Sequence, residues 1–322
     1  MNIETRLNEI IVSTVLKNIP KNLKPVSFLM DLFDLSRESV YRRIRGEIPF
    51  TIEEIVKLSI NLGFSVDEII EGNKRDRVFF DLQADTSVQP QDAFLLMCKN
   101  HHAQLLNIIN AENKNVLVAL NNLPAVYSAS FNNLFRFFYY EWLQHNHDGL
   151  TKLYYSDVII SPELASMQEK IIQDSKKSDN STIILSPNLF LNLIRNIQYY
   201  HKRKLITDEE LQLLKEDIAN LIDSTEKVAK TGALETTNRV DIYLSTLSIN
   251  SNIAYIKYGN NIEAHLLIHP VNPIIIHNPE VCAMQKNWLY CLKKHSRLIT
   301  QSNEILQTFF FDKQREYLEK IL

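Results

Sequence analysis

The chain has 322 residues, of which 45% are hydrophobic and 23% are charged, and its formal net charge is -3 at pH 7. This length exceeds that of one average domain, so we expect two or more. The slightly negative charge excludes a generally basic, histone-like nucleic-acid binder, and any contact with nucleic acid must come from a local patch.

Cysteine usage and the N-terminal residues bear on the compartment. The three cysteines, Cys98, Cys282 and Cys291, form no paired framework and no C-x-x-C motif, which is typical of inert thiols in a reducing cytoplasm. The chain starts without a signal-peptide pattern, and no apolar run reaches the length of a membrane span. We therefore expect a cytoplasmic protein that makes no membrane contact.

The first 75 residues show the apolar spacing of five short helices. Pro20 ends the first helix, and Pro25 suits the first turn of the second. Thr51 is a good N-cap for the fourth helix, and Ser65 for the fifth. The expected helices cover residues 3–18, 25–33, 36–46, 52–62 and 65–72.

The third of these helices carries the candidate chemistry. Ser36 is a good N-cap, and Gly46 is a good stop because glycine adopts the left-handed conformation that ends helices. Val40 and Ile44 share one face and are expected to be buried. The other faces carry arginines, which can donate two hydrogen bonds to guanine or one to a phosphate. For an isolated helix a charged face is more often a solvated face, so the flanking sequence decides the interpretation.

The flanking residues point to a family. The segment from residue 27 to residue 70 resembles the helix-turn-helix domain of lambda-repressor-like (Cro/C1, XRE-type) regulators. The matching residues are Phe28-Leu29-Met30, Leu35-Ser36, Val40, Gly46, the run Phe50-Thr51-Ile52-Glu53-Glu54-Ile55, and the run Leu62-Gly63-Phe64-Ser65-Val66-Asp67-Glu68-Ile69-Ile70. Asp34 stands where the family often has glycine, and Met30 where a small residue is usual.

The resemblance implies that residues 1–75 form an all-α, five-helix domain that binds double-stranded DNA. By position it assigns DNA contacts to Ser36, Arg37, Glu38, Tyr41, Arg42 and Arg45. Arg43 is assigned either a phosphate contact or a pair with an acidic side chain. The departures from the family pattern leave open which of these side chains face the bases.

Residues 76–90 read as a linker, and residues 91–322 as a larger α+β domain that carries no family pattern we can name. Several helices are expected between residues 92 and 230, with short strands at 116–120 and 183–185. Alternation of apolar and polar residues then predicts an antiparallel sheet near 240–277, with a hairpin turn at Gly259-Asn260-Asn261. The fold class is therefore α+β. The pattern leaves open whether this region is one domain or a helical part, 91–230, followed by a sheet-containing part, 231–322.

Candidate catalytic and metal sites are sparse in the larger region. His265 and His269 share a face of one expected strand, and His277 could join them around a metal, but the strong zinc spacings are absent and a structural role is favoured. The chain has no P-loop, no G-x-G-x-x-G and no G-x-S-x-G motif. We therefore assign no catalytic residue, no cofactor and no metal, and do not expect an enzyme.

The stretch from Phe131 to Gln144 is a very aromatic helix, for which a core position is favoured over a ligand pocket or a dimer surface. Taken together, the sequence predicts a DNA-binding transcriptional regulator that acts as a homodimer. Its C-terminal domain is expected to dimerise, to sense a small-molecule effector of unknown identity, or both. Two alternatives stay open: a DNA-targeted enzyme with a C-terminal catalytic domain, and a protein-interaction module.

Overall fold

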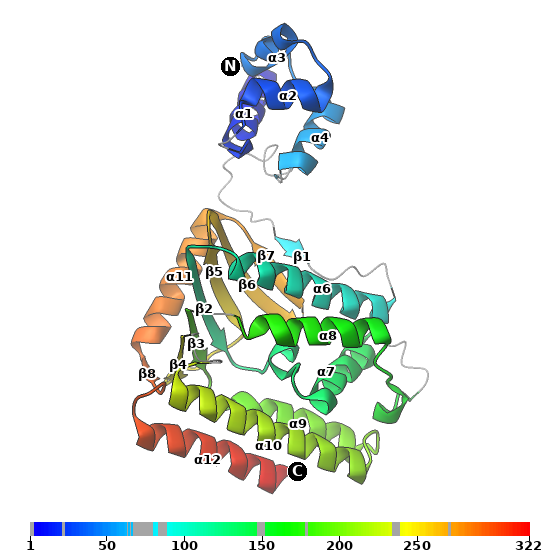
Figure 1. Ribbon diagram of the computed structural model, residues 1–322, viewed down its shortest axis with the longest axis vertical. Helices are drawn as coiled ribbons and strands as arrows, with labels where there is room; N and C mark the ends of the chain where they lie inside the picture. The colour runs from blue at the N-terminus through cyan, green and yellow to red at the C-terminus, as the bar shows by residue number, and fades with distance from the viewer. Residues whose placement is uncertain are drawn as a thin grey trace. The chain divides into compact units, whose positions relative to one another are not determined.

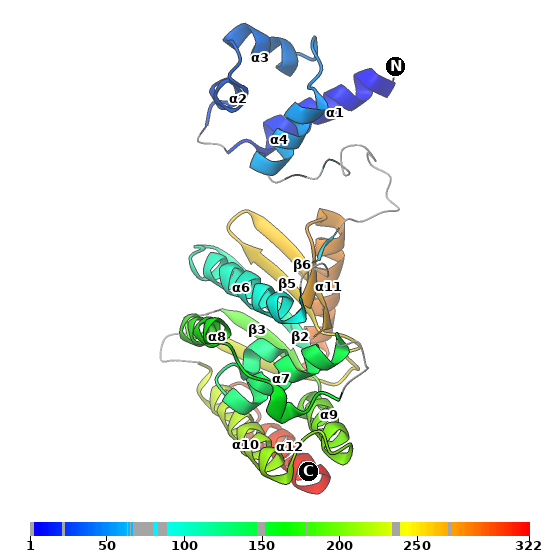
Figure 2. The ribbon, with the colours of Figure 1, turned by 90° about the vertical axis from the view of Figure 1, so that its right-hand side faces the viewer.

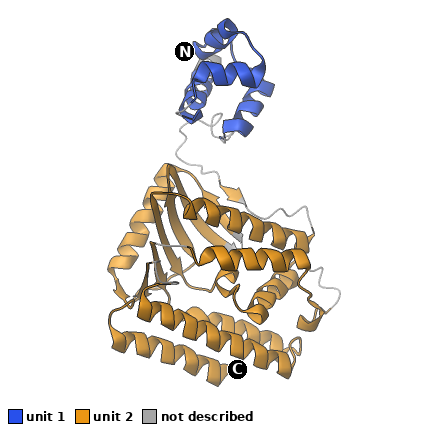
Figure 3. Ribbon diagram, viewed as in Figure 1, with its two compact units in different colours: residues 1–79 blue, residues 80–322 orange. Residues whose placement is uncertain are grey.

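The computed structural model describes residues 3–20, 23–62, 64, 66, 80–82, 89–146, 152–177, 180–233, 239–269 and 272–322. The chain divides into two compact units, Met1–Phe79 and Phe80–Leu322 (Figure 3). Each unit has its own hydrophobic core, so each is described by itself.

The N-terminal unit is a bundle of short helices whose bounds follow the sequence pattern closely. Its described helices are α1 (Ile3–Asn18), α2 (Pro25–Phe33), α3 (Arg37–Ile44) and α4 (Ile52–Leu62). Their core includes Val15, Leu29, Val40 and Leu58, each at most 1% exposed. The fifth expected helix and the polar part of the linker lie outside the described residues.

The C-terminal unit is built on one mixed sheet of eight strands among the described residues (Figure 1). The strand order is β1-β7-β6-β5-β2-β3-β4-β8. β2, β3 and β4 run parallel to one another, whereas every other neighbouring pair is antiparallel. The strands are β1 (Asp81–Leu82), β2 (Lys114–Leu120), β3 (Ser181–Leu185), β4 (Val240–Ser245), β5 (Ile253–Tyr258), β6 (Asn261–His269), β7 (Asn272–Ile276) and β8 (Ser296–Leu298).

The α+β class is confirmed, but the sheet is wider than the antiparallel one predicted near 240–277. β5, β6 and β7 form the expected antiparallel meander, with Gly259 at a φ of +54° in the turn. β4 is not their neighbour, because it pairs in parallel with β3. β2 and β3 precede residue 230, so the regions 91–230 and 231–322 share one sheet.

Helices cover both faces of this sheet (Figures 1 and 2). α11 packs on one face, where Leu117 and Tyr255 of the sheet meet Leu289 of the helix. The opposite face carries the main core, to which the remaining long helices contribute. The helices are α6 (Pro90–Ile109), α7 (Asn132–His145), α8 (Pro162–Ser175), α9 (Leu189–Lys202), α10 (Asp208–Thr231), α11 (Pro279–Lys294) and α12 (Glu304–Ile321), with 3-10 turns η1 (Ala125–Ser128) and η2 (Tyr155–Asp157).

The aromatic helix α7 is a central element of the main core. Leu134, Phe135, Phe137 and Tyr140 are fully buried, and their neighbours from Phe138 to Trp142 are at most 8% exposed. The core position predicted for this stretch is therefore confirmed. No helix among the described residues combines the length and apolar character needed to span a membrane.

Candidate nucleic-acid interface

The turn between α2 and α3 determines how α3 is presented. Asp34, at the C-cap of α2, has φ +52° and ψ +44°, a left-handed conformation that aspartate tolerates better than most residues. Its neighbour Leu35 donates its backbone N–H to the Met30 carbonyl at 3.3 Å. Ser36 then caps α3, since its hydroxyl accepts the Ser39 N–H at 3.3 Å. Aspartate at this position is thus compatible with a tight turn between α2 and α3.

α3 has one buried face and one charged, exposed face. Val40 is 1% exposed within the core of the N-terminal unit, and Ile44 is half-buried against it. Six of the seven predicted contact residues lie on the exposed side, namely Ser36, Arg37, Glu38, Tyr41, Arg42 and Arg45. Charged side chains are therefore available to a partner along the length of α3.

Arg43 is the predicted site residue that the fold turns away from this surface. Its guanidinium makes two hydrogen bonds to the Glu54 carboxylate, Nε to Oε2 at 3.2 Å and Nη2 to Oε1 at 2.9 Å. The Arg43 and Glu54 side chains are 14% and 15% exposed. Glu54 also accepts the Thr51 N–H, so the pair ties α3 to the N-cap of α4. Of the two roles assigned to Arg43, the structure shows the pair with an acid.

Arg42 and Arg45 are held far more loosely. Both reach Glu47, which follows the helix, at Nε-to-carboxylate distances of 3.4 Å and 3.2 Å. The two arginine side chains are 50% and 60% exposed, and Glu47 is 45% exposed. Exposed pairs of this kind contribute little to stability, so a phosphate can displace Glu47 at small cost.

Arg37 and Tyr41 form a second pair on the same surface. The guanidinium carbon of Arg37 lies 5.6 Å from the centre of the Tyr41 ring, and Arg37 Nη2 donates to the Tyr41 hydroxyl at 3.4 Å. Tyr41 is 39% exposed. The contact orients a cation and a phenol side by side, both of which can donate to phosphate oxygens.

The surface is less positive than the sequence of α3 alone indicates. Within the helix and its C-cap, four arginines stand against Glu38 alone. In three dimensions Glu47 pairs with Arg42 and Arg45, while Glu54 of α4 pairs with Arg43. Gly46 ends the helix at a φ of +74°, and the Glu47 backbone N–H that follows donates to the Arg42 carbonyl. The contacts of Glu47 with the two exposed arginines were not predicted from the sequence.

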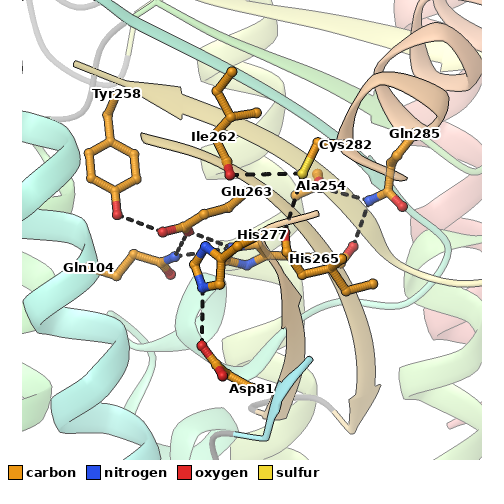
Figure 4. A network of polar contacts seen from close by, with 11 residues as sticks. Asp81, Gln104, Ala254, Tyr258, Ile262, Glu263, His265, His277, Cys282 and Gln285 are labelled. Carbon is orange, nitrogen blue, oxygen red and sulfur yellow. Dashed lines mark hydrogen bonds and ion pairs between the residues drawn. The ribbon is translucent and has the colours of Figure 1, made fainter. Parts of the chain in front are cut away.

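The histidines considered as metal ligands are engaged in separate contacts (Figure 4). His265 Nε2 lies 2.9 Å from Glu263 Oε2 and 3.1 Å from Gln104 Nε2 in a buried network, whereas His277 contacts Asp81 at 3.1 Å. The His269 side chain lies outside the described residues. Among the residues that are described, no group of three or more His, Cys, Asp or Glu side chains is placed to hold a metal ion.

The Glu263 carboxylate is the centre of that network. It accepts hydrogen bonds from Tyr258 at 2.6 Å and from Gln104 at 2.6 Å. Burial raises the pKa of Glu263, but its hydrogen bonds with His265 and Tyr258 outweigh burial and hold the pKa below its usual value. The network thus stabilises an ionised glutamate between α6 and β6.

A polar cavity of about 510 Å³ in the C-terminal unit was not predicted from the sequence. It is lined by segments that follow β2 and by one face each of α7 and α9. Glu141 of α7 is 6% exposed there, and burial raises its pKa to about 7 against the lowering effect of a hydrogen bond from Asn196. The only hint of this cavity in the sequence was Glu141, a single acidic residue within the aromatic stretch from Phe131 to Gln144.

Comparison with known proteins bears on the N-terminal third of the chain. A family model described as the BetR domain matches residues 8–111, which is about a third of the sequence. The match takes in the helical unit and extends through α6 of the second unit. No curated protein and no solved structure matches the chain. The similarity to the BetR domain points to a regulatory, DNA-binding role.

Proposed function

We propose that this protein is a sequence-specific transcriptional regulator that reads double-stranded DNA through α3, in the manner of lambda-repressor-like proteins. The observation that carries the proposal is the two-sided character of α3, whose Val40 side is buried while its arginines and Tyr41 are exposed. A capped helix presented by a tight turn is the form in which helix-turn-helix proteins enter the major groove. The BetR match supports a regulatory role for the same segment.

The test is selection from genomic DNA. Purified full-length protein is mixed with a library of genomic fragments at moderate salt, and the bound fragments are sequenced. We expect enrichment of a two-fold symmetric motif that is lost in the Arg42→Ala/Arg45→Ala variant. Absence of any enriched motif for the wild-type protein would contradict DNA reading by the unliganded chain and would favour a protein-interaction module.

A homodimer is part of the proposal, because one short helix covers few base pairs and two linked copies gain affinity and specificity. α12 offers a surface for it. Ile305 and Phe309, one turn apart, are 87% and 67% exposed, while Phe310 and Phe311 of the same helix are buried. Thr308 and Asp312 flank them around an open hollow of about 520 Å³.

Sedimentation equilibrium tests this surface. We expect the wild-type protein to be dimeric and the Ile305→Glu/Phe309→Glu variant to be a folded monomer with an unchanged circular dichroism spectrum, because both side chains are exposed in the monomer. Its unfolding midpoint should no longer depend on protein concentration, since association no longer stabilises the native state. A variant that stays dimeric would place the dimer interface elsewhere.

The C-terminal unit is proposed to sense a small molecule rather than to catalyse a reaction. Its polar cavity supports this role. Because Glu141, His145 and Arg195 line the same cavity, it also leaves a catalytic function as the alternative. Recovery of an added ligand unchanged after incubation with the protein supports the sensor, and its conversion would favour the enzyme.

A further inference from the structure

The polar cavity lies at the carboxyl end of a parallel strand. Asn121, Asn122 and Leu123 follow β2 directly and line it. β2 and β3 run in parallel, and the carboxyl ends of such strands are where open sheets of this kind commonly hold their ligands. The volume of about 510 Å³ falls in the range of small-molecule sites.

Two helices supply the walls, each with one face. α7 contributes side chains spaced three or four residues apart, namely Phe138, Glu141, Trp142 and His145. α9 contributes Asn192, Leu193, Arg195 and Asn196. Segments well separated in the sequence therefore converge on one space.

The polar groups of the cavity are held in place by hydrogen bonds within the protein. Asn252, which is 6% exposed, accepts the backbone N–H groups of Asn121 and Asn122 at 2.7 Å and 3.0 Å. Asn192 Nδ2 donates to Asn122 Oδ1 at 2.6 Å, and Asn196 Nδ2 donates to Glu141 Oε1 at 2.9 Å. Such a fixed arrangement lowers the ordering cost of binding a ligand.

The groups left over indicate the chemistry of the ligand. Among the described residues, no side-chain partner engages the Asn121 amide, the Oδ1 atoms of Asn192 and Asn196, or Glu141 Oε2. Amides and a carboxyl group offer both donors and acceptors, which suits hydroxyl groups, since each hydroxyl both donates and accepts. The lining includes the acidic Glu141 together with the basic Arg195 and His145, so groups of both signs are present and a neutral ligand meets no single charge.

The remaining lining is apolar and includes an aromatic ring. Leu123, Phe138 and Leu193 contribute carbon surface. Trp142 donates its indole N–H to the Pro90 carbonyl at 2.7 Å, so its ring supplies further apolar surface. The C–H face of a sugar ring packs well on such a surface while its hydroxyls reach the amides. We propose that this cavity binds a neutral monosaccharide or polyol. The proposal names a ligand class for the sensing role proposed above, and it rests on that role only for the claim that binding regulates the protein.

The two tryptophans of the chain make the proposal directly testable. Trp142 lines the cavity, whereas Trp288 lies on α11 and is 51% exposed. In the full-length Trp288→Phe variant, tryptophan fluorescence therefore comes from Trp142 alone. The probes are glucose, galactose, fructose, ribose, mannitol and myo-inositol, with glutamate, succinate and spermidine as charged counterparts.

We expect a saturable change of Trp142 emission with at least one neutral probe and none with the charged ones. Adding Asn192→Ala to this background should weaken binding about tenfold, the effect of losing one well-placed hydrogen bond. Gln212→Ala, an exposed change on α10, should leave the affinity unchanged. Calorimetry on the wild-type chain provides a second readout of the same binding.

Three results would overturn the proposal: no binding of any neutral probe by either method, binding that Asn192→Ala leaves unaltered, or binding of the charged probes only. All measurements are made without DNA. Failure of the cavity assay is therefore distinguishable from failure of DNA reading, which depends on α3.

Discussion

The two units of this protein arrange their polar chemistry in opposite ways. In the N-terminal unit, α3 presents Arg37, Arg42 and Arg45 on an exposed face, with one apolar side buried beneath. In the C-terminal unit, α7 is buried over most of its length and contributes Glu141, which is 6% exposed, to a partly open cavity. Exposed charge suits a large, charged partner such as DNA, and polar groups that line a concave site suit a small molecule.

The same contrast appears inside the N-terminal unit itself. Arg43 and Glu54 are mostly buried and joined by two hydrogen bonds, whereas Arg42 and Arg45 share the exposed Glu47. A buried, bidentate pair fixes helix packing, and an exposed pair is easily exchanged for another anion. Adjacent arginines can therefore have different roles, and each can be tested separately.

The largest expected effect is on DNA binding. Replacing both Arg42 and Arg45 by alanine removes two exposed cations, each of which contributes about 2 kcal/mol when it contacts a base or a phosphate. Affinity for the selected DNA motif should fall by roughly a thousandfold, and the salt dependence should become shallower. Fluorescence anisotropy at several salt concentrations measures both. Lys17→Ala/Lys24→Ala removes the same charge from other exposed positions of the unit, and an equal loss there would contradict a specific role for α3.

The next effect is on stability in the C-terminal unit and depends on pH. Burial raises the pKa of Glu141 from 4.5 to about 7, so the folded state keeps its proton where the unfolded state has lost it. Stability should therefore fall as pH rises from 4.5 to about 7 and should stay reduced above that range. Glu141→Gln removes this cost, which is at most about 3 kcal/mol at pH 8, and changes little at pH 4.

Urea unfolding at both pH values measures the difference. The matched control is Glu169→Gln, at an exposed position of α8, for which no gain at high pH is expected. A Glu141→Gln gain that is the same at both pH values would show that its cause is packing rather than ionisation.

The pair that fixes α3 to α4 should give a smaller effect on stability. Arg43→Met keeps an unbranched apolar stem but removes both hydrogen bonds to Glu54, at a cost of about 2 kcal/mol to the N-terminal unit. Thermal unfolding measures the change. Lys57→Met, at an exposed position of α4, should be nearly neutral. Equal effects of the two changes would show that the Arg43–Glu54 pair adds no more to the free energy of unfolding than an exposed side chain does.

The smallest expected effect is a gain of DNA affinity. Glu47→Gln removes the carboxylate that engages Arg42 and Arg45 and that would repel a nearby phosphate. We expect affinity to rise about threefold, the effect of one weak surface charge. Glu53→Gln, an exposed change on α4, controls for net charge, and an equal rise there would indicate a general rather than a local effect.

The N-terminal unit could be predicted in detail because its signals are local. Ser36, Pro25 and Thr51 define helix starts through the chain's own hydrogen bonding and backbone restrictions. The spacing of Val40 and Ile44 identifies the buried face of α3. The role of Arg43 could not be decided in the same way, because Glu54 lies on another helix and reaches it only after α3 and α4 pack.

The sheet shows the corresponding limit for the larger unit. The segments that form β2, β3, β4 and β5 were recognised from their apolar patterns, yet their order was not, since alternation along a strand carries no information about its neighbours. β4 lies beside β3 because helices α9 and α10 bridge the two strands in a parallel crossover. β4, which was expected to be an antiparallel neighbour of β5, thus proved to be a parallel neighbour of β3.

Local hydrogen bonding and side-chain periodicity, which can be read along the chain, determined the helices of the N-terminal unit, the exposed arginines of α3 and the α+β class. Packing between distant segments decided the rest. It placed Glu54 against Arg43, joined β2 and β3 to the later strands, and brought Asn121, Glu141 and Asn192 to one cavity. The physical reason is that a helix face depends on neighbours three or four residues away, whereas a cavity depends on contacts between elements that no short window of sequence contains.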